Sequence, residues 1–198
     1  MKKKIAILGS TGSIGKSLIN IIRKEKNKYQ IVLLSANKNC NQLMKQAKEF
    51  NVKNIIITDQ KNYDKIKKNS KYKRMNVFQD FKCFKKIFKK KIDYTMSSII
   101  GIEGLKPTLE IIRYTNIIAI ANKESIICGW NLIKRKLKKN NTEFIPIDSE
   151  HFSIYELIKN EKSENIKKIY ITASGGPFLN INKSKLSRFI PKNAIKHP

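Results

Sequence analysis

Three glycines, Gly9, Gly12 and Gly15, follow a short apolar stretch, Ile5–Leu8, and lead into a segment of helical periodicity that begins at Ile14. Glycine lets the backbone turn tightly and approach a ligand closely, and the N–H groups of a first helical turn face an anion. A strand, glycines and a helix in this order favour a pyrophosphate-binding loop. The spacing G-x-x-G-x-x-G matches the commoner G-x-G-x-x-G only in part, and a purely structural turn is the alternative.

The chain has 198 residues, of which 40% are hydrophobic, enough for a core shared by one or two domains. No apolar run reaches the roughly 18 residues of a membrane span, and no signal-peptide pattern opens the chain. We expect a cytoplasmic protein, or a plastid protein stripped of its targeting segment. Cys40, Cys83 and Cys128 form no C-x-x-C pair and predict ordinary buried or half-buried thiols in a reducing compartment.

The formal net charge of +27 raises the question of nucleic-acid binding. All but five of the 42 basic residues are lysine, and they are spread along the whole chain. Base-specific contacts favour arginine, whose planar fork bonds two atoms of one base. Lysine, asparagine and isoleucine are abundant together, as they are in proteins from AT-rich genomes. We therefore expect weak, salt-sensitive attraction to polyanions and no specific nucleic-acid partner.

Apolar runs and helical periodicity alternate along residues 5–147. The runs are rich in Ile, which is typical of a parallel sheet covered on both faces. In the first helix, Ile14, Leu18, Ile21 and Ile22 would face the core. The alternation predicts an α/β fold with a doubly wound, mostly parallel sheet. The expected strands are 5–8, 30–35, 54–58, 92–96, 117–121 and 144–147, and the expected helices are 14–24, 40–50, 59–68, 81–88, 107–114 and 124–137.

The pattern changes after Asp148, where a second domain of α+β type would begin. We accordingly divide the chain into 1–147 and 148–198. No regular element closes the second part before Pro198, so we expect the sequence to be incomplete. The elements expected there are a helix over 152–158, a polar loop over 159–165 and a strand over 168–172.

The stretch after the second expected strand contains Lys38 and Asn39 and no carboxylate. An Asp or Glu at this place would accept a hydrogen bond from the ribose 2′-hydroxyl of NAD. Its absence, with Lys38 close by, favours the 2′-phosphate of NADPH. The alternative is a solvated lysine in a lysine-rich chain.

Three further polar clusters each follow an expected strand, at the sheet edge where open α/β folds bind ligands. Residues 122–125, Asn-Lys-Glu-Ser, suit a ligand site or a plain helix N-terminus. Within 148–151, Asp148 and Glu150 would point to one side in extended chain and reach one Mg²⁺ or Mn²⁺, a polar helix cap being the alternative. Residues 174–176, Ser-Gly-Gly, would bind a phosphate or form a tight turn.

Five blocks of this sequence, taken in order, closely resemble the 1-deoxy-D-xylulose 5-phosphate reductoisomerase family. They are Gly9–Gly15, Ala121–Ser125, Pro146–His151, Ser174–Phe178 and Lys196–Pro198. The resemblance spans the whole chain as the N-terminal half of such an enzyme. It implies a Rossmann-like nucleotide-binding domain and the start of a catalytic domain. The implied reaction is the NADPH-dependent rearrangement and reduction of 1-deoxy-D-xylulose 5-phosphate to 2-C-methyl-D-erythritol 4-phosphate, an early step in isoprenoid precursor synthesis by the non-mevalonate route.

The resemblance also implies roles for individual residues. A cation, Mg²⁺, Mn²⁺ or Co²⁺, would act as a Lewis acid on the sugar-phosphate substrate, and the nicotinamide would supply hydride. The complete protein would be a homodimer. By motif, the catalytic residues are Lys123, Asp148 and Glu150, with Asp148 and Glu150 on the metal; the cofactor-binding residues are Thr11, Gly12, Ser13, Ile14, Lys38, Asn39, Asn122 and Glu124; and the substrate-binding residues are Lys123, Ser149, Glu150, Ser174 and His197.

The sequence departs from the family pattern in two places. Asn37 stands where the family often has Gly, and asparagine tolerates a positive φ better than other residues. The sequence also stops before the family's Trp-bearing loop and its further metal carboxylate. We therefore expect these 198 residues alone to bind NADPH weakly and not to turn over substrate. Another NADPH-dependent oxidoreductase and a non-catalytic truncated remnant are the alternatives.

Overall fold

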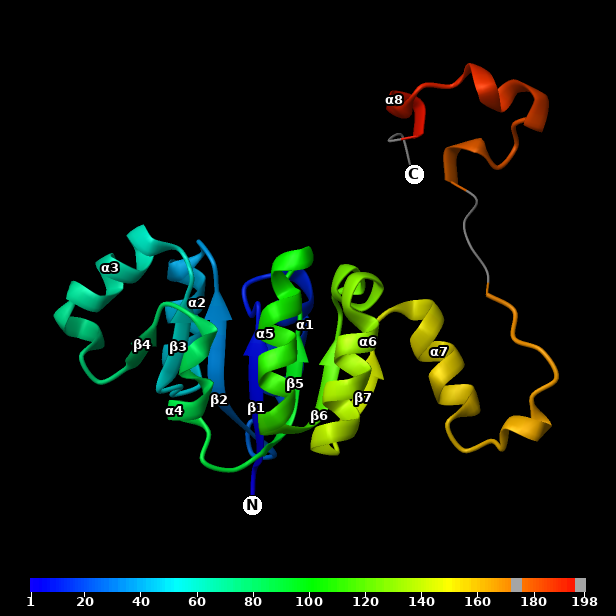
Figure 1. Ribbon diagram of the computed structural model, residues 1–198. Coiled ribbons are helices and arrows are strands. Elements are labelled where there is room, and N and C mark those ends of the chain that lie inside the picture. The colour runs from blue at the N-terminus through cyan, green and yellow to red at the C-terminus, as the bar shows by residue number, and fades with distance from the viewer. Residues whose placement is uncertain (172–175, 195–198) are drawn as a thin grey trace. The chain divides into compact units, whose positions relative to one another are not determined.

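The computed structural model describes residues 1–171 and 176–194. Its centre is a seven-stranded sheet whose neighbouring strands are all parallel, in the order β4-β3-β2-β1-β5-β6-β7 (Figure 1). The prediction of a doubly wound sheet is confirmed, and the sheet is wholly rather than mostly parallel. The strands are β1 Lys3–Leu8, β2 Tyr29–Ala36, β3 Asn54–Ile57, β4 Asn76–Phe78, β5 Ile92–Ser97, β6 Thr115–Ile120 and β7 Glu143–Pro146.

Helices cover the sheet on both faces, as parallel strands require. One apolar cluster joins the sheet to α1, α2 and α3, and a second joins its other face to α4, α5 and α6. Consecutive residues of a strand point to opposite faces, so Ile55, Ile56 and Ile57, all fully buried, serve both clusters. The helices are α1 Ser13–Lys24, α2 Cys40–Glu49, α3 Gln60–Lys68, α4 Phe84–Ile87, α5 Leu105–Ile111, α6 Lys123–Asn140, α7 Ser149–Ile158 and α8 Pro191–Ala194.

The buried side of α1 differs from the predicted one. Gly15, Ile19 and Ile22 are buried, whereas Ile21 is 58% exposed. Gly15 lies against the backbone of Ser10, and this close approach sets the rotation of the helix about its axis. Ile19 and Ile22, which lie four and seven residues after Gly15, then face the sheet.

Strand β4 was not predicted. Its three residues, Asn76–Phe78, are too few to show a period, and pairing with β3 defines the strand. The Asn76 N–H donates to the carbonyl of Lys53 at 2.7 Å, and the Asn76 amide donates to the Asn54 amide oxygen at 3.0 Å. Both partners lie more than 20 residues away in sequence, beyond the reach of a local pattern.

The strand expected over 168–172 is not formed in its described part, 168–171. Ile169, Tyr170 and Ile171 are 48%, 78% and 63% exposed, and the segment pairs with no strand among the described residues. High β-propensity describes a side chain that fits a pleated, half-buried surface. Without a neighbouring strand to supply hydrogen bonds, such a segment has no reason to form one.

Two helices begin earlier than expected. Helix α5 starts at Leu105, so Pro107 lies in its first turn, where its missing N–H costs nothing. Helix α7 starts at Ser149 rather than at Phe152. At its C-terminus α6 continues to Asn140 and ends at Asn141 in the left-handed conformation, a common helix stop.

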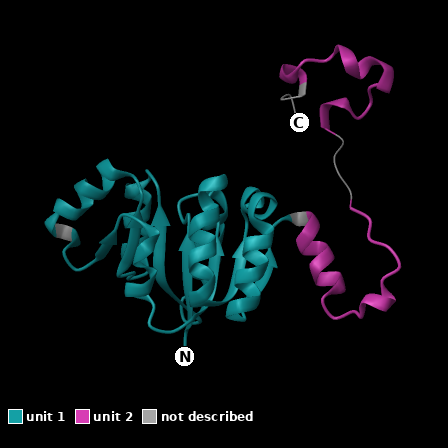
Figure 2. Cartoon of the chain, viewed as in Figure 1, with its two compact units in different colours: residues 1–148 teal, residues 149–198 magenta. Residues whose placement is uncertain are grey.

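The chain divides into two compact units, Met1–Asp148 and Ser149–Pro198 (Figure 2). The first contains the whole sheet. The described part of the second contains α7, α8 and short 3₁₀ turns, with the rings of Phe178 and Phe189 5.1 Å apart. Among the described residues, no helix combines the length and the hydropathy needed to cross a bilayer. The functional division of the chain stays a prediction.

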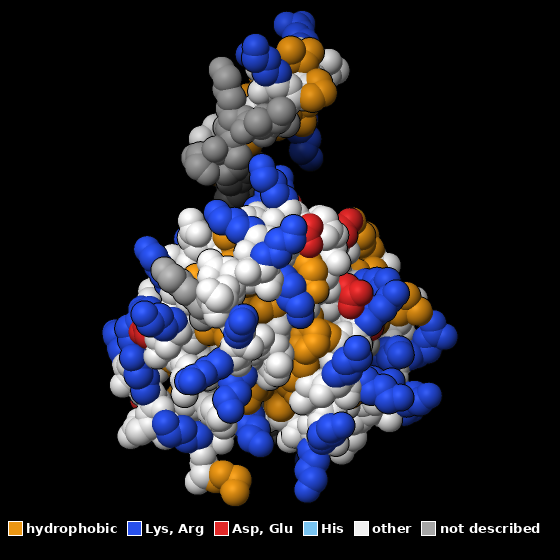
Figure 3. Space-filling model, turned by 90° about the vertical axis from the view of Figure 1, so that its left-hand side faces the viewer, with side chains coloured by type: hydrophobic (Ala, Val, Ile, Leu, Met, Phe, Trp, Pro, Cys, Tyr) orange, Lys and Arg blue, Asp and Glu red, His pale blue; other side chains and the backbone are white. Residues whose placement is uncertain are grey.

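The three cysteines are free. Cys40 and Cys83 are buried as predicted, and burial raises the pKa of the Cys83 thiol to about 12. The prediction was wrong for Cys128, which is exposed because it lies on the solvent side of α6. Lys and Arg side chains are scattered over the face of the molecule in Figure 3, with few acidic side chains between them.

Candidate functional site

The carboxyl ends of the parallel strands meet along one edge of the sheet, and the strand order reverses between β1 and β5. Loops that leave such neighbouring strands in opposite directions open a ligand crevice. Here the β5 loop is tied to the end of β1, because the Ser98 N–H and hydroxyl donate to the Leu8 carbonyl at 2.9 and 2.8 Å. The edge between β1 and β5 is therefore the candidate site.

Two of the three glycines after β1 are required by the fold itself. Gly9 has a φ of +82°, and a Cβ there would lie 2.7 Å from the Ser98 carbonyl oxygen. A Cβ on Gly15 would lie 2.6 Å from the Ser10 Cα. Gly12 is different, since its φ is ordinary and an added Cβ would meet only the Gly9 oxygen, at 3.4 Å. The packing therefore does not demand glycine at position 12, where glycine suits a helix N-cap and would also admit the close approach of a ligand.

Helix α1 presents an open N-terminus at this point. Gly12 occupies the cap position without a side-chain hydrogen bond, and the first turn contains no acidic residue. Within the described residues, the N–H groups of Thr11, Ser13 and Ile14 have no acceptor. Such unpaired donors, with the helix dipole behind them, attract an anion. This arrangement fits the pyrophosphate of a dinucleotide.

The segment after β2 also lies at this edge. Asn37, Lys38 and Asn39 are all exposed. The Asn39 side chain caps α2 by accepting from the Gln42 N–H at 3.1 Å, so only part of this amide is available to a ligand. The Lys38 ammonium has no ion-pair partner in the part of the chain that the structure describes.

Asn37 does not use the positive φ that its position in the family pattern suggested. Among the described residues, Asn51 and Asn141 are the non-glycine residues with positive φ, and both follow helices. The Asn37 amide instead donates to the Thr58 hydroxyl at 2.8 Å, joining the ends of β2 and β3. The turn therefore forms without glycine.

Asn122 is confirmed as a helix cap. Its amide oxygen accepts from the Ser125 N–H at 2.7 Å, and its amide nitrogen donates to the carbonyls of Ile99 and Gly101, the latter at 2.6 Å. The side chain is only 2% exposed. Since both N–H bonds of the amide are used within the protein, a cofactor contact would involve its backbone or the second lone pair of its oxygen.

The neighbours of Asn122 are arranged differently. Lys123 and Glu124 are exposed in the first turn of α6, with their charged ends accessible. Ser125 is fully buried, and its hydroxyl has no partner among the described residues. Lys123 and Glu124 therefore lie at the carboxyl edge of the sheet, where their cofactor and substrate contacts were predicted.

The acidic segment after β7 does not have the predicted backbone. Asp148 precedes the helix, and Glu150 lies in the first turn of α7. Residues two apart on a helix do not face each other, so extended chain no longer explains how both carboxylates reach one cation. Two hard oxygen donors suit Mg²⁺ or Mn²⁺ but fill only part of a coordination shell. Among the described residues, no cluster of three or more His, Cys, Asp and Glu side chains is present.

The side chains of three predicted substrate residues are not described by the structure. Ser174 and His197 lie outside the described residues, and the placement of the Ser149 side chain is likewise not described. Ser149 itself is the first residue of α7.

Comparison with known proteins decides the family. Residues 5–129 match the 1-deoxy-D-xylulose 5-phosphate reductoisomerase family, and residues 144–198 match its C-terminal domain. The chain belongs to the 1-deoxy-D-xylulose 5-phosphate reductoisomerase family. It is 56% identical to the reductoisomerase of Pelagibacter ubique (strain HTCC1062), over 99% of this chain and 51% of that protein. The chain spans about half the length of the curated relatives it matches.

Solved reductoisomerase structures agree with the fold. The enzyme from Zymomonas mobilis, solved in complex with NADPH, matches with a TM-score of 0.88 and 32% identity, over all of this chain and 52% of that chain. A reductoisomerase solved with NADPH, fosmidomycin and magnesium matches with a TM-score of 0.80 and 31% identity, over 99% of this chain and 51% of that chain.

One part of this edge was not predicted. The loop after β5 exposes Ile100 and Ile102, which are 83% and 52% accessible. Gly101 between them has a φ of +75°. Two exposed isoleucines beside the strand reversal are an apolar surface that a planar ring could cover. The signal was present in the sequence as apolar residues on both sides of a turn glycine.

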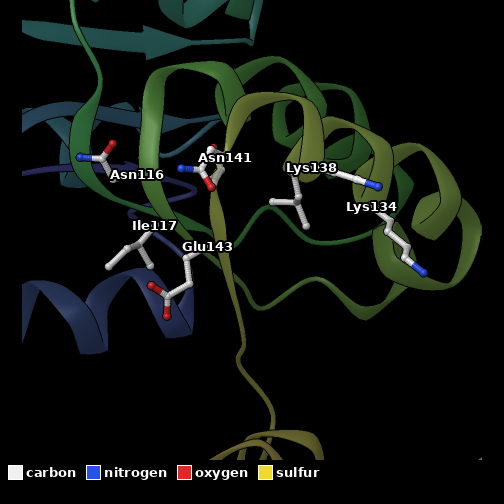
Figure 4. Close-up of a pocket in the computed structure, with 8 residues that line it drawn as sticks. Asn116, Ile117, Lys134, Lys138, Asn141 and Glu143 are labelled. Carbon is white, nitrogen blue, oxygen red and sulfur yellow. The ribbon is translucent and has the colours of Figure 1, made fainter. Parts of the chain in front are cut away.

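One hollow lies elsewhere. It measures about 790 Å³ and opens at the amino ends of β6 and β7, the edge opposite the candidate site. Figure 4 shows Asn116, Ile117 and Glu143 on one side of it, and Lys134 and Lys138 of α6 on the other. None of the predicted site residues lines this hollow, so we give it no role in the candidate chemistry.

Proposed function

We propose that the protein to which this chain belongs converts 1-deoxy-D-xylulose 5-phosphate to 2-C-methyl-D-erythritol 4-phosphate, using NADPH and a divalent cation. The observation that carries the proposal is the open N-terminus of α1 beside Gly12, in a chain of this family. The Zymomonas mobilis relative, solved with NADPH, supports the choice of cofactor. The relative solved with fosmidomycin and magnesium supports a divalent cation.

The cofactor would lie along the carboxyl edge of the sheet. The unpaired N–H groups of the Gly9–Ile14 loop would bind its pyrophosphate, and the exposed ammonium of Lys38 would meet its 2′-phosphate. Ile100 and Ile102 would cover the nicotinamide and keep water from the transferred hydride. The residues proposed for the cofactor are Thr11, Gly12, Ser13, Ile14, Lys38, Asn39, Asn122 and Glu124.

The metal and the substrate would be held by Lys123 and by residues from Asp148 onward in the sequence. A divalent cation bound there supplies Lewis-acid stabilisation of negatively charged substrate oxygens. Asp148 and Glu150 would hold it, with water and substrate completing its shell. The Lys123 ammonium would orient the substrate by charge. The residues proposed for the substrate are Lys123, Ser149, Glu150, Ser174 and His197.

Two other functions remain as competing proposals. One is a different NADPH-dependent oxidoreductase, which would need no cation at Asp148. The other is a non-catalytic remnant, because this chain spans about half of its relatives. Membership of the reductoisomerase family favours the first proposal over both. The homodimer, the cytoplasmic location and the lack of a specific nucleic-acid partner stay predictions.

The proposal is tested with NADPH, 1-deoxy-D-xylulose 5-phosphate and Mg²⁺, measuring NADPH oxidation by absorbance. The complete reading frame should turn over only when the cation is present. The 198-residue chain should bind NADPH in a calorimeter without turnover. Cation-independent NADPH oxidation would favour the other oxidoreductase. A complete protein that neither binds nor oxidises NADPH would favour the non-catalytic remnant.

A further inference from the structure

A buried polar cluster lies beneath the candidate pyrophosphate loop. It consists of Ser10, Ser35 and Gln46, which are 0%, 1% and 1% exposed. The three residues come from different elements: Ser10 follows β1, Ser35 is near the end of β2, and Gln46 lies in the middle of α2. Ser10 belongs to the Gly9–Gly15 block, whereas Ser35 and Gln46 belong to none of the motifs that identified the loop. Burying polar side chains is costly unless each is hydrogen bonded, so their placement needs a reason.

Every bond in the cluster is directed at the start of the loop. The Ser10 hydroxyl donates to the Gln46 amide oxygen at 2.8 Å, and the Gln46 amide nitrogen donates to the Ser10 carbonyl at 2.9 Å. The Ser10 N–H donates to the Ser35 carbonyl at 2.9 Å. The Gly9 N–H donates to the Ser35 hydroxyl at 3.0 Å. We call these three residues the Ser10 clamp.

The clamp holds one end of the loop, and Gly15 holds the other. The Gly15 Cα packs against the Ser10 backbone so closely that a Cβ would lie 2.6 Å from the Ser10 Cα. The segment between these anchors, Thr11–Ile14, contains the N–H groups that have no acceptor among the described residues. The Gly12 N–H donates to the Gly9 carbonyl at 3.1 Å, and the Gly12 carbonyl accepts from the Lys16 N–H at 2.9 Å. The two anchors and these bonds together set the direction of the Thr11, Ser13 and Ile14 N–H groups.

We propose that Gln46 and Ser35 are positioning residues that preorganise the Thr11–Ile14 N–H groups for the cofactor pyrophosphate. The inference rests on the proposed function, because it takes NADPH as the ligand. Neither residue need touch the cofactor. A loop already fixed in its binding geometry loses less conformational entropy when the ligand arrives, which raises affinity without a new contact.

The clamp acts on one part of the cofactor. Lys38, three residues beyond Ser35, would meet the 2′-phosphate on the adenosine part of the cofactor and has no bond to the clamp. Loosening the clamp should therefore weaken binding of a ligand that contains the pyrophosphate. It should leave adenosine 2′-monophosphate, which has no pyrophosphate, bound as before.

The test compares Gln46→Met with the parent protein by calorimetric titration of the full chain. Methionine keeps the bulk and removes both hydrogen bonds to Ser10. We expect the Kd for NADPH to rise about tenfold, because the variant loses hydrogen bonds that hold the loop in its binding geometry. The Kd for adenosine 2′-monophosphate should be unchanged. Ser35→Ala removes only the acceptor of the Gly9 N–H and should raise the NADPH Kd by a smaller factor. It also keeps the test open if Gln46→Met does not fold.

A matched control separates positioning from plain loss of stability. The Thr142 hydroxyl is buried at the opposite edge of the sheet, with the carbonyls of Ile112 and Thr115 each at 2.9 Å as acceptors for its one proton, and it accepts from the Lys91 ammonium at 3.2 Å. Thr142→Val should lower the melting temperature much as Gln46→Met does, with no change in NADPH affinity. Equal NADPH affinity in Gln46→Met and the parent would overturn the inference, as would equal losses for both nucleotides. A parent protein that does not bind NADPH would overturn the proposed function instead.

Discussion

Two loops at the same edge of the sheet, one after β1 and one after β7, are built in different ways. The β1 loop is fixed by glycine contacts and by the Ser10 clamp, all within the first unit. The β7 segment passes from Asp148 straight into α7, the first helix of the second unit. All the residues proposed for the cofactor therefore belong to the sheet unit. The two residues proposed for the metal are divided, because Asp148 ends the first unit and Glu150 belongs to the second.

The largest expected effect concerns the metal half. Asp148→Asn removes one negative charge from the pair of proposed cation ligands and leaves the shape nearly unchanged. We expect turnover of the complete protein to fall at least about 100-fold, with NADPH affinity unaltered. Initial rates across a Mg²⁺ titration, with a parallel calorimetric titration of NADPH, measure both. Unchanged turnover with an unchanged cation requirement would show that Asp148 is not a ligand of the cation.

The second prediction separates two glycines of the β1 loop. Gly9→Ala places a Cβ against the Ser98 backbone at a positive φ, so we expect about 3 kcal/mol of lost stability. Gly12→Ala meets only ordinary contact, so the melting temperature should change little while NADPH affinity falls more than about tenfold. Thermal denaturation and calorimetry distinguish the two. A Gly12→Ala protein that binds NADPH normally would show that no ligand approaches there.

The third prediction sharpens the cofactor half by testing its specificity. Lys38→Ala removes the exposed cation after β2. We expect NADPH affinity to fall about five- to tenfold, since one charge-assisted contact to phosphate is lost. Binding of NADH, which has no 2′-phosphate, should be unchanged. Lys45→Ala, on an exposed position of α2, is the matched control for loss of one positive charge. Equal losses for NADPH and NADH would show that Lys38 does not read the 2′-phosphate.

The smallest expected effect concerns the packing of α1 on α2. The Arg23 side chain donates to both carboxylate oxygens of Glu49, at 2.5 and 2.8 Å, and this bond lowers the pKa of Glu49 below its ordinary value of 4.5. A lowered folded-state pKa adds stability above the unfolded value, and this stability is lost as the pH falls through the folded one. Both side chains are largely solvated, so the effect is small. Urea unfolding of the parent and Glu49→Gln from pH 6 to pH 3 should show the two curves converging at the acid end.

Much of the first unit was predictable because its signals are local. The Ile runs of the strands, the glycines after β1 and the cap at Asn122 each lie within a few residues of the structure they cause. The roles assigned to the candidate site residues stay predictions, although the Gly9–Gly15 and Asn122–Ser125 motifs do directly follow β1 and β6. The buried side of α1 was not, because the contact between Gly15 and Ser10 decides it.

Other features needed partners that are distant in sequence. Gln46 looks like one more polar residue of α2 until Ser10, 36 residues away, is seen to share both its hydrogen bonds. The strand expected over 168–172 is absent from its described residues because they have no neighbouring strand to pair with.

The sequence by itself determined that strands and helices alternate, that the sheet is parallel and that a glycine-rich loop joins the first strand to a helix. These depend on side-chain period, glycine and capping, which act over less than two helical turns. Only the tertiary structure decided the strand order, the existence of β4 and the clamp beneath the loop. Each of these rests on hydrogen bonds or packing between residues far apart in the chain, which no local pattern encodes.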